Sequence, residues 1–430
     1  MAGLNKYQAY PEYRDSGMEW LGEIPRTWQA YTGKRLFSSV RTPALSNDEQ
    51  LAASQKYGVI PQTLMMQLND SKVMLALKGT DSFRHVEKNN FVISLRSFEG
   101  GIEHSNYQGC VSPAYTVLKS VNDISFSFYR YLLKSEPYIS ALQASTDSLR
   151  DGKSINYEQV GAITLPSPSL PEQSIIAHFL DHETAKIDNL IEKQQQLIEL
   201  LKEKRQAVIS HAVTKGLNPD VPMKDSGVEW LGEVPKHWHI CKLKWFANLK
   251  SGDFITSNSI EPEGNYPVYG GNGLRGYYSY FTHNGEYVLI GRQGALCGNI
   301  NYAIGKFWAS EHAVVVTPNE RAVTIWLGEL LRIMNLNQYS VSAAQPGLAV
   351  ERITDLYIPI PPYQEQVNIG TYISKYISLD KNLIEHSTDN IELLKERRTA
   401  LISAAVTGKI DLRNWTAPIS EAETPTEASA

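Results

Sequence analysis

The chain carries one unusual fourteen-residue segment twice, and this duplication restricts its fold more than any other feature. The segment reads DSGMEWLGEIPRTW at 15–28 and DSGVEWLGEVPKHW at 225–238, with ten identical positions. An internal repeat normally marks a structural unit that occurs more than once. We therefore expect two equivalent mounting points in the fold.

A second duplicated block follows each of these repeated segments. LLKEKRQAVISHAVTKG occupies 200–216 and LLKERRTALISAAVTGK occupies 393–409, with eleven matching positions. A proline-rich start precedes each block, LPSPSLPEQ at 165–173 and IPIPPYQEQ at 358–366. The stretches between the duplicated blocks do not match one another. The order along the chain is thus a repeated frame that holds two different inserts.

This order predicts the domain organisation. The expected parts are an N-terminal frame segment at 1–28, a first insert domain at 29–165, a central frame region with a long helix at 166–238, a second insert domain at 239–358, a distal frame region with a long helix at 359–413, and a disordered tail at 414–430. The tail is acidic and almost free of large apolar residues, which is typical of disorder.

The two frame regions predict two long helices. The first opens at Pro171–Gln173 and continues without Gly or Pro until Gly216. Apolar residues at 3–4 spacing form a coiled-coil seam that polar residues interrupt at matched places in both copies. The seam residues are Ile187, Ile191, Ile198, Leu201 and Val208, then Ile384, Ile391, Leu394 and Leu401. The matched interruptions favour two helices packed antiparallel on each other, over the alternative that each packs on its own domain.

The repeated segments are interpreted as docking elements where the chain leaves the frame. Their tryptophans are Trp20, Trp28, Trp230 and Trp238, and the glycine and proline between them interrupt regular structure. Anchoring in the core is the preferred interpretation, and ligand binding by the tryptophans is the alternative.

The inserts show more strand than helix signals, and an α+β fold is expected for each. β-rich runs lie at 89–101, 285–303 and 306–317, and helices are expected near 124–144 and 321–335. The inserts carry net charges of +2 and 0, so the frame holds the acidic excess of the chain, whose total is −5.

Several insert loops place basic residues beside Gly, Ser, Gln, Asn and Tyr, a composition that suits contacts with bases and phosphates. The alternative for each is a solvated turn. The candidate DNA-binding residues are Arg96, Ser97, Arg150, Lys153, Arg275, Tyr277, Tyr278, Arg292, Gln293 and Gln345.

Other function classes lack support. Residues 271–276 fit GxGxxG but lie in an expected turn between strands, with no helix after it. Pro361-Pro362-Tyr363 resembles part of an amino-methyltransferase motif, but Ile360 cannot accept the hydrogen bond that the motif requires. No nucleophile–base pair or metal-ligand pattern is evident. Three scattered cysteines, no apolar leader and no long apolar run favour a cytoplasmic protein without membrane contact.

The arrangement resembles the specificity subunits of type I restriction-modification systems. The resemblance is carried by the paired EWLGEIPRTW and EWLGEVPKHW, the PEQ and QEQ helix starts, the two LLKE blocks, and IGRQGALCGNINYAIGKFW with YGGNGLRGYY before it. Together these features span nearly the whole chain.

The resemblance implies two α/β target recognition domains, each reading half of a bipartite double-stranded DNA site, separated by two long helices that form an antiparallel coiled coil with pseudo-twofold symmetry. It also implies two modification subunits that methylate adenine with S-adenosylmethionine, and restriction subunits that use ATP and Mg. The chain itself would be non-catalytic and without a cofactor.

A helix over 183–213 would be roughly 46 Å long, comparable with the ~34–36 Å between half-sites one DNA turn apart. Frame length is therefore expected to set the spacing, and the inserts the sequence. Two rivals remain, a repeat scaffold whose inserts bind proteins and a self-sufficient adenine methyltransferase.

Overall fold

A computed structural model describes residues 6–69, 82–94, 101–145, 155–294, 296–340 and 347–418. Its contacts divide the chain into two compact units. Unit 1 combines residues 1–193 with 389–430, and unit 2 is the continuous run 194–388. Unit 1 therefore contains both the first and the last parts of the chain.

In unit 1 the first repeated segment forms a short hairpin of β1 (Tyr13–Asp15) and β2 (Glu23–Pro25). The next strand, β3 (Gln29–Thr32), pairs antiparallel with β12 (Thr164–Ser167). The first insert thus leaves and rejoins the frame through one two-stranded ribbon.

The first insert is an α+β domain. Its main sheet has the order β4 (Phe37–Val40), β11 (Thr116–Ser120), β8 (Phe91–Ile93) and β9 (Ile102–His104), all antiparallel. Two ribbons accompany it, β5 (Leu51–Ser54) with β6 (Gly58–Pro61) and β7 (Arg84–Val86) with β10 (Gly109–Val111). The helices are α1 (Gly33–Leu36), α2 (Gln62–Asn69), α3 (Phe126–Leu132), α4 (Glu136–Ala144) and α5 (Tyr157–Ala162).

In unit 2 the second repeated segment forms the equivalent hairpin, β13 (Met223–Asp225) with β14 (Glu233–Pro235). The equivalent ribbon joins β15 (His239–Lys242) to β22 (Tyr357–Ile360). The two units therefore share the same frame pattern around different inserts.

The second insert contains a six-stranded sheet. Its order is β16 (Ala247–Ser251), β21 (Ala313–Pro318), β19 (His283–Gly291), β20 (Ile300–Ala309), β17 (Tyr266–Gly270) and β18 (Gly273–Tyr278), with only β17 and β20 parallel among these described pairs. The helices are α7 (Leu243–Phe246), α8 (Thr324–Ile333) and α9 (Val350–Thr354), with 3-10 turns η3 (Ser257–Ser259) and η4 (Leu336–Tyr339).

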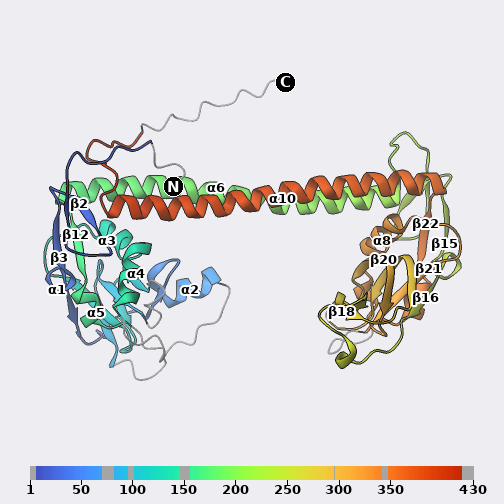
Figure 1. Cartoon of the computed structure of the whole chain (residues 1–430), viewed down its shortest axis with the longest axis horizontal. Helices are drawn as coiled ribbons and strands as arrows, with labels where there is room; N and C mark the ends of the chain where they lie inside the picture. Colours follow the sequence, from blue (N-terminus) through green and yellow to red (C-terminus); the bar gives the residue numbers. More distant parts are fainter. Residues whose placement is uncertain are drawn as a thin grey trace. The chain divides into compact units, whose positions relative to one another are not determined.

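The predicted long helices are α6 (Leu170–Lys215) and α10 (Tyr363–Val406), green and red in Figure 1. In unit 1 the first half of α6 packs antiparallel on the last half of α10, and Asp188 accepts from the Arg398 guanidinium at 2.9 Å. In unit 2 Arg205 lies 3.9 Å from Asp380. All nine predicted seam residues are buried or half-buried. The prediction that the helices pack on each other is confirmed.

Most local predictions agree with the structure. Residues 271–272 form the turn between β17 and β18, Gly273 and Gly276 lie in β18, and Pro361-Pro362 precedes the start of α10. The helical stretch near 124–144 divides into α3 and α4. The predicted disordered tail begins too early, because the Trp415 ring packs 5.4 Å from that of Phe179. Residues 419–430 lie outside the described part.

Candidate DNA-recognition site and its frame

The last tryptophan of each repeated segment is fixed by a glutamate at the start of a long helix. Trp28 is fully buried, and its Nε1 donates to Glu172 Oε1 at 2.9 Å. Trp238 is 1% exposed, and its Nε1 donates to Glu365 Oε2 at 2.9 Å. A buried indole N–H needs such an acceptor. The duplicated Trp and Glu therefore form one contact that occurs in both units.

The neighbouring glutamine ties each insert to the same helix start. Gln173 Oε1 accepts from the Ser125 backbone N–H at 2.8 Å, just before α3. Gln366 Oε1 accepts from the Val323 N–H at 3.1 Å, just before α8. Each glutamine also donates to a proline carbonyl, of Pro168 or Pro361, at the helix start. The frame thereby fixes where an insert helix begins, whatever the rest of the insert contains.

The middle of each repeated segment is held by a lysine close to the C-terminus of a long helix. Lys409 Nζ donates to the Glu23 carbonyl at 3.1 Å, and Lys215 Nζ donates to the carbonyls of Glu233 and Leu231. Each lysine adjoins a glycine with positive φ, which lets the helix end beside a buried tryptophan. Hence the first segment meets the end of α10, and the second meets the end of α6.

The first tryptophan of each repeated segment, Trp20 in unit 1 and Trp230 in unit 2, has different surroundings in the two units. The Trp20 ring lies 6.1 Å from Tyr138 and packs against the core of unit 1. Trp230 is 37% exposed, so the prediction that it anchors the core is wrong. The described part of unit 2 places no aromatic ring against it that corresponds to Tyr138.

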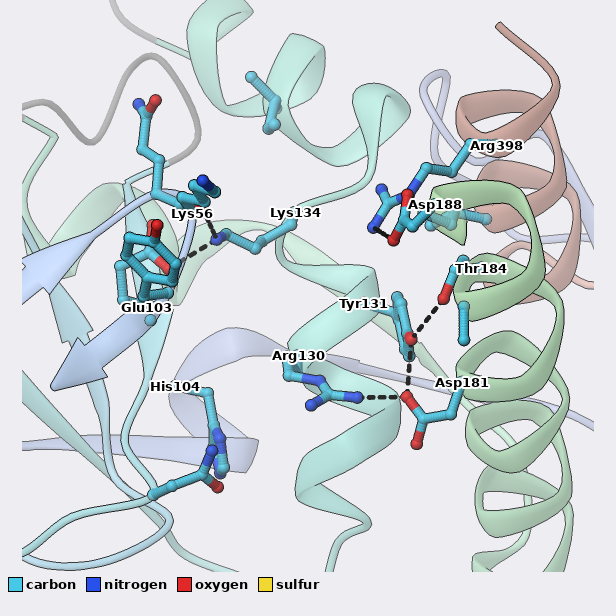
Figure 2. A pocket seen from close by; sticks show the side chains of 17 residues that line it. Lys56, Glu103, His104, Arg130, Tyr131, Lys134, Asp181, Thr184, Asp188 and Arg398 are labelled. Atoms are coloured by element: carbon cyan, nitrogen blue, oxygen red, sulfur yellow. Dashed lines mark hydrogen bonds and ion pairs between the residues drawn. The ribbon is translucent and has the colours of Figure 1, made fainter. Parts of the chain in front are cut away.

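Figure 2 shows a pocket of about 570 Å³ in unit 1, between the first insert and the helices. Arg130 and the Tyr131 hydroxyl, both on α3, donate to Asp181 of α6 at 2.5 and 2.6 Å. Deeper in the insert, Lys134 pairs with Glu103 at 2.6 Å. These opposite charges are paired with each other, so the pocket holds the insert against the helix and has little excess positive charge for a phosphate.

Burial changes the acid–base behaviour of two neighbours in this region. It raises the pKa of the Glu103 carboxyl, although Lys134 opposes that change. It also lowers the pKa of His104 to about 4, with the charges of Arg130 and Lys88 acting in the same direction. His104 is therefore neutral near pH 7, and its Nε2 lies 3.2 Å from Asn89 Oδ1.

In unit 2 the structure brings three predicted DNA-binding residues to neighbouring loops. A Cβ on Gly270 would collide with the Arg275 side chain. A Cβ on Gly271 would lie 3.4 Å from the Gln293 carbonyl oxygen and 3.7 Å from the Arg292 nitrogen. Arg275 and Gln293 are exposed and Arg292 is half-buried. Glycines thus allow the β17–β18 turn and the loop after β19 to come together.

The other predicted residues have different outcomes. Tyr277 and Tyr278 are half-buried. The Tyr278 ring centroid lies 5.2 Å from that of Trp308 and 5.5 Å from that of Tyr280, so much of the Tyr278 ring packs against other residues of the insert. Five residues lie outside the described part: Arg96, Ser97, Arg150, Lys153 and Gln345.

Two kinds of residue were not predicted from the sequence. Glu172 and Glu365 are duplicated, but their pairing with the tryptophans was not predicted, although both sets repeat together. His312, whose carbonyl accepts from the Arg292 N–H at 2.9 Å, was not predicted either. Only the fold brings that turn to the Arg292 loop.

Comparison with known proteins identifies the class. The family model described as "Type I restriction modification DNA specificity domain" matches residues 25–200 and 235–393. The two matches cover most of the chain, and each contains one insert together with the first part of the long helix that follows it. The chain belongs to this family.

Individual relatives belong to the same family. The chain is 41% identical over 143 residues to the type I restriction enzyme EcoprrI specificity subunit of Escherichia coli, across 32% of this chain and 36% of that protein, so the match spans about a third of the relative's length. It is 23% identical to the MjaVIII specificity subunit of Methanocaldococcus jannaschii, across 95% of this chain and 98% of the relative. The crystal structure of the HsdS subunit from Thermoanaerobacter tengcongensis has a similar fold, with TM-score 0.55, 15% identity, and coverage of 90% and 98%.

The described residues contain no group of three or more His, Cys, Asp or Glu placed to hold a metal ion. None of their helices is long and apolar enough to cross a membrane.

Proposed function

We propose that this chain is the DNA sequence-specificity subunit of a type I restriction-modification complex, with each insert reading one half of a bipartite site. The observation that carries this proposal is the pair of equivalent tryptophan–glutamate contacts beneath unlike sheets of four and six strands. A repeated frame with different inserts suits one assembly that reads two unrelated half-sites.

In the second insert, Arg275, Arg292 and Gln293 are the proposed DNA contacts. Guanidinium groups donate two hydrogen bonds to guanine, and a glutamine amide matches adenine. Their loops adjoin one another, as the close approach of Gly271 to both Arg292 and Gln293 requires. The proposed contacts in the first insert remain Arg96, Ser97, Arg150 and Lys153.

Catalysis is assigned to partner subunits. Two modification subunits would bind S-adenosylmethionine and methylate adenine, and restriction subunits would use ATP and Mg. The duplicated frame supports two copies of a modification subunit, because it offers the same backbone pattern twice. The chain itself would be non-catalytic and would need no cofactor.

The test is adenine methylation by the assembled complex, read across a genome. The Arg292→Ala and Gln293→Ala variants are expected to relax one half-site and leave the other unchanged. Each good base contact contributes ~1–3 kcal/mol of discrimination, or roughly 5- to 150-fold. Lys381→Ala, on an exposed face of α10, is the matched control. An unchanged motif in both variants would favour the protein-binding scaffold.

Two further measurements separate the remaining alternatives. Binding of S-adenosylmethionine to the isolated chain would favour a self-sufficient methyltransferase. Removal of matching heptads from α6 and α10 is expected to shorten the unspecified gap of the DNA motif. An unchanged gap would contradict a spacer role for the helices.

A further inference from the structure

The two units cover the start of a long helix in different ways. In unit 1 two chain segments lie there, residues 6–13 and residues 410–415, and the Asp411 N–H donates to the Gln8 carbonyl at 2.7 Å. Unit 2 has one connecting segment at this place, residues 217–222, between α6 and β13. The same helix face therefore has less chain available to cover it in unit 2.

A tyrosine fills this place in unit 1. Tyr10 is 5% exposed, and its hydroxyl donates to Glu172 Oε1 at 2.6 Å. Arg413 lies over its ring, 5.1 Å from the centroid. Two turns further along α6, the rings of Tyr7 and Trp415 each lie 5.4 Å from Phe179, which is 1% exposed. Aromatic residues of the two segments thus seal the helix face.

The equivalent face of α10 is open. The offset of 193 between the duplicated blocks relates Glu172 to Glu365 and Phe179 to Tyr372. Tyr372 is 42% exposed. Earlier along α10, about one to two turns before Tyr372, lies a pocket of about 240 Å³, with Pro235, Ile369 and Glu365 among its lining residues. Apolar walls next to a carboxylate are the surroundings that Tyr10 has in unit 1.

We infer that this pocket of unit 2 is a docking site for an extended, tyrosine-bearing segment of a partner protein. The phenol ring would pack between Pro235 and Ile369, and its hydroxyl would donate to Glu365. The Glu365 side chain retains 38% exposure although Trp238 and His237 already contact it. It therefore has room for a third donor, as a carboxylate with four lone pairs allows.

The inference goes beyond the proposed function and does not depend on DNA recognition. An acidic ligand would be repelled by Glu365, and a purely aliphatic one would leave the carboxylate without the hydrogen bond that it gains from a phenol. The internal repeat thus identifies the chemistry of the occupant, because unit 1 carries its own copy.

The test uses that copy as a probe. A fluorescent peptide of residues 4–14, LNKYQAYPEYR, is titrated against the full chain. Saturable binding of this peptide is expected. A peptide that carries Tyr10→Phe should bind about tenfold more weakly, because it lacks the phenol hydroxyl that donates to the charged Glu365 carboxylate. In the chain, Asn368→Arg should fill the pocket mouth and reduce affinity at least tenfold; Asn368 is exposed, so the fold should tolerate it. Leu383→Arg, further along the exposed face of α10, should leave affinity unchanged.

Two outcomes would overturn the proposal. One is no binding at millimolar peptide, and the other is equal binding by the Asn368→Arg chain, which would place the peptide elsewhere. In an assembled complex, a thiol cross-linker on Tyr372→Cys is expected to capture a tyrosine-containing segment of the modification subunit. Capture of a second copy of this chain instead would identify a self-contact and refute a separate partner.

Discussion

Units 1 and 2 use the same tryptophan–glutamate contact in different surroundings. Glu172 is 7% exposed and accepts from both Trp28 and Tyr10, whereas the Glu365 side chain is 38% exposed and contacts Trp238 and His237. The bond lengths to the tryptophans are the same. Repetition of a contact therefore preserves its geometry, while the chain segments around it decide how much free energy it contributes.

The largest expected effect comes from removing the tryptophans. Trp28→Ala and Trp238→Ala should each lower the free energy of unfolding by about 3–5 kcal/mol, because each leaves a large cavity and removes one of the two hydrogen bonds to the paired glutamate. Chemical denaturation with hydrogen exchange resolved by unit measures this loss. Trp230→Ala, at an exposed site, should cost under about 1 kcal/mol. Equal losses for all three would show that burial is not the cause.

Replacement of the two glutamates should lower the free energy of unfolding by different amounts in the two units. Glu172→Ala leaves two buried donors unpaired and should cost about 2–4 kcal/mol. Glu365→Ala should cost about 1 kcal/mol, because the Glu365 carboxylate is already partly hydrated and its partner His237 is exposed to water. The same denaturation experiment measures both, with Glu396→Ala on the exposed face of α10 as control. A larger loss at Glu365 would reverse the comparison.

Acid should destabilise the first insert more than the second. The folded pKa of His104 lies near 4, below its ordinary 6.5, so the unfolded chain binds its proton more tightly. The contribution of neutral His104 to the free energy of unfolding is fully present above pH 6.5. It falls by on the order of 2 kcal/mol as the pH drops towards 4. Burial also lowers the pKa of His283 in the second insert. Unfolding measured between pH 4.5 and 7 should show a flatter profile for His104→Gln than for His283→Gln.

The smallest effect is expected in the helix seam. Asp380 is 3% exposed, has its nearest cation, Arg205, at 3.9 Å, and corresponds by the offset of 193 to the apolar Ile187 of unit 1. Asp380→Ile should stabilise unit 2 by about 1 kcal/mol, because a poorly paired buried carboxylate is replaced by apolar contact. Asp389→Ile, at an exposed position, should change little. A loss of stability would mean that the Arg205–Asp380 pair is stronger than its distance suggests.

Elements that depend on local pattern were predictable. Helix α6 was expected to open at Pro171 and end at Gly216, and it spans Leu170–Lys215. The seam followed from 3–4 spacing, since that period is a property of the helix itself. The strand runs in the inserts were located, but their pairing order was not, because it depends on contacts between distant residues.

The candidate site was only partly predictable for the same reason. Arg275 and Arg292 were named separately from their loops, yet nothing in the sequence shows that Gly271 brings those loops together. Trp230 and Trp20 occupy equivalent repeat positions but differ in exposure, because Tyr138 belongs to an insert and has no counterpart in the repeat.

The discontinuity of unit 1 has a consequence for biosynthesis. A ribosome delivers all of unit 2 by residue 388, whereas unit 1 still lacks residues 389–415, which supply Leu401 and Trp415 to its core. Unit 2, which begins only at residue 194, is thus the first unit that translation can complete. Until the end of α10 emerges, Phe179 and Ile187 lack part of their cover, and the nascent chain is exposed to misassociation and chaperone capture at these residues.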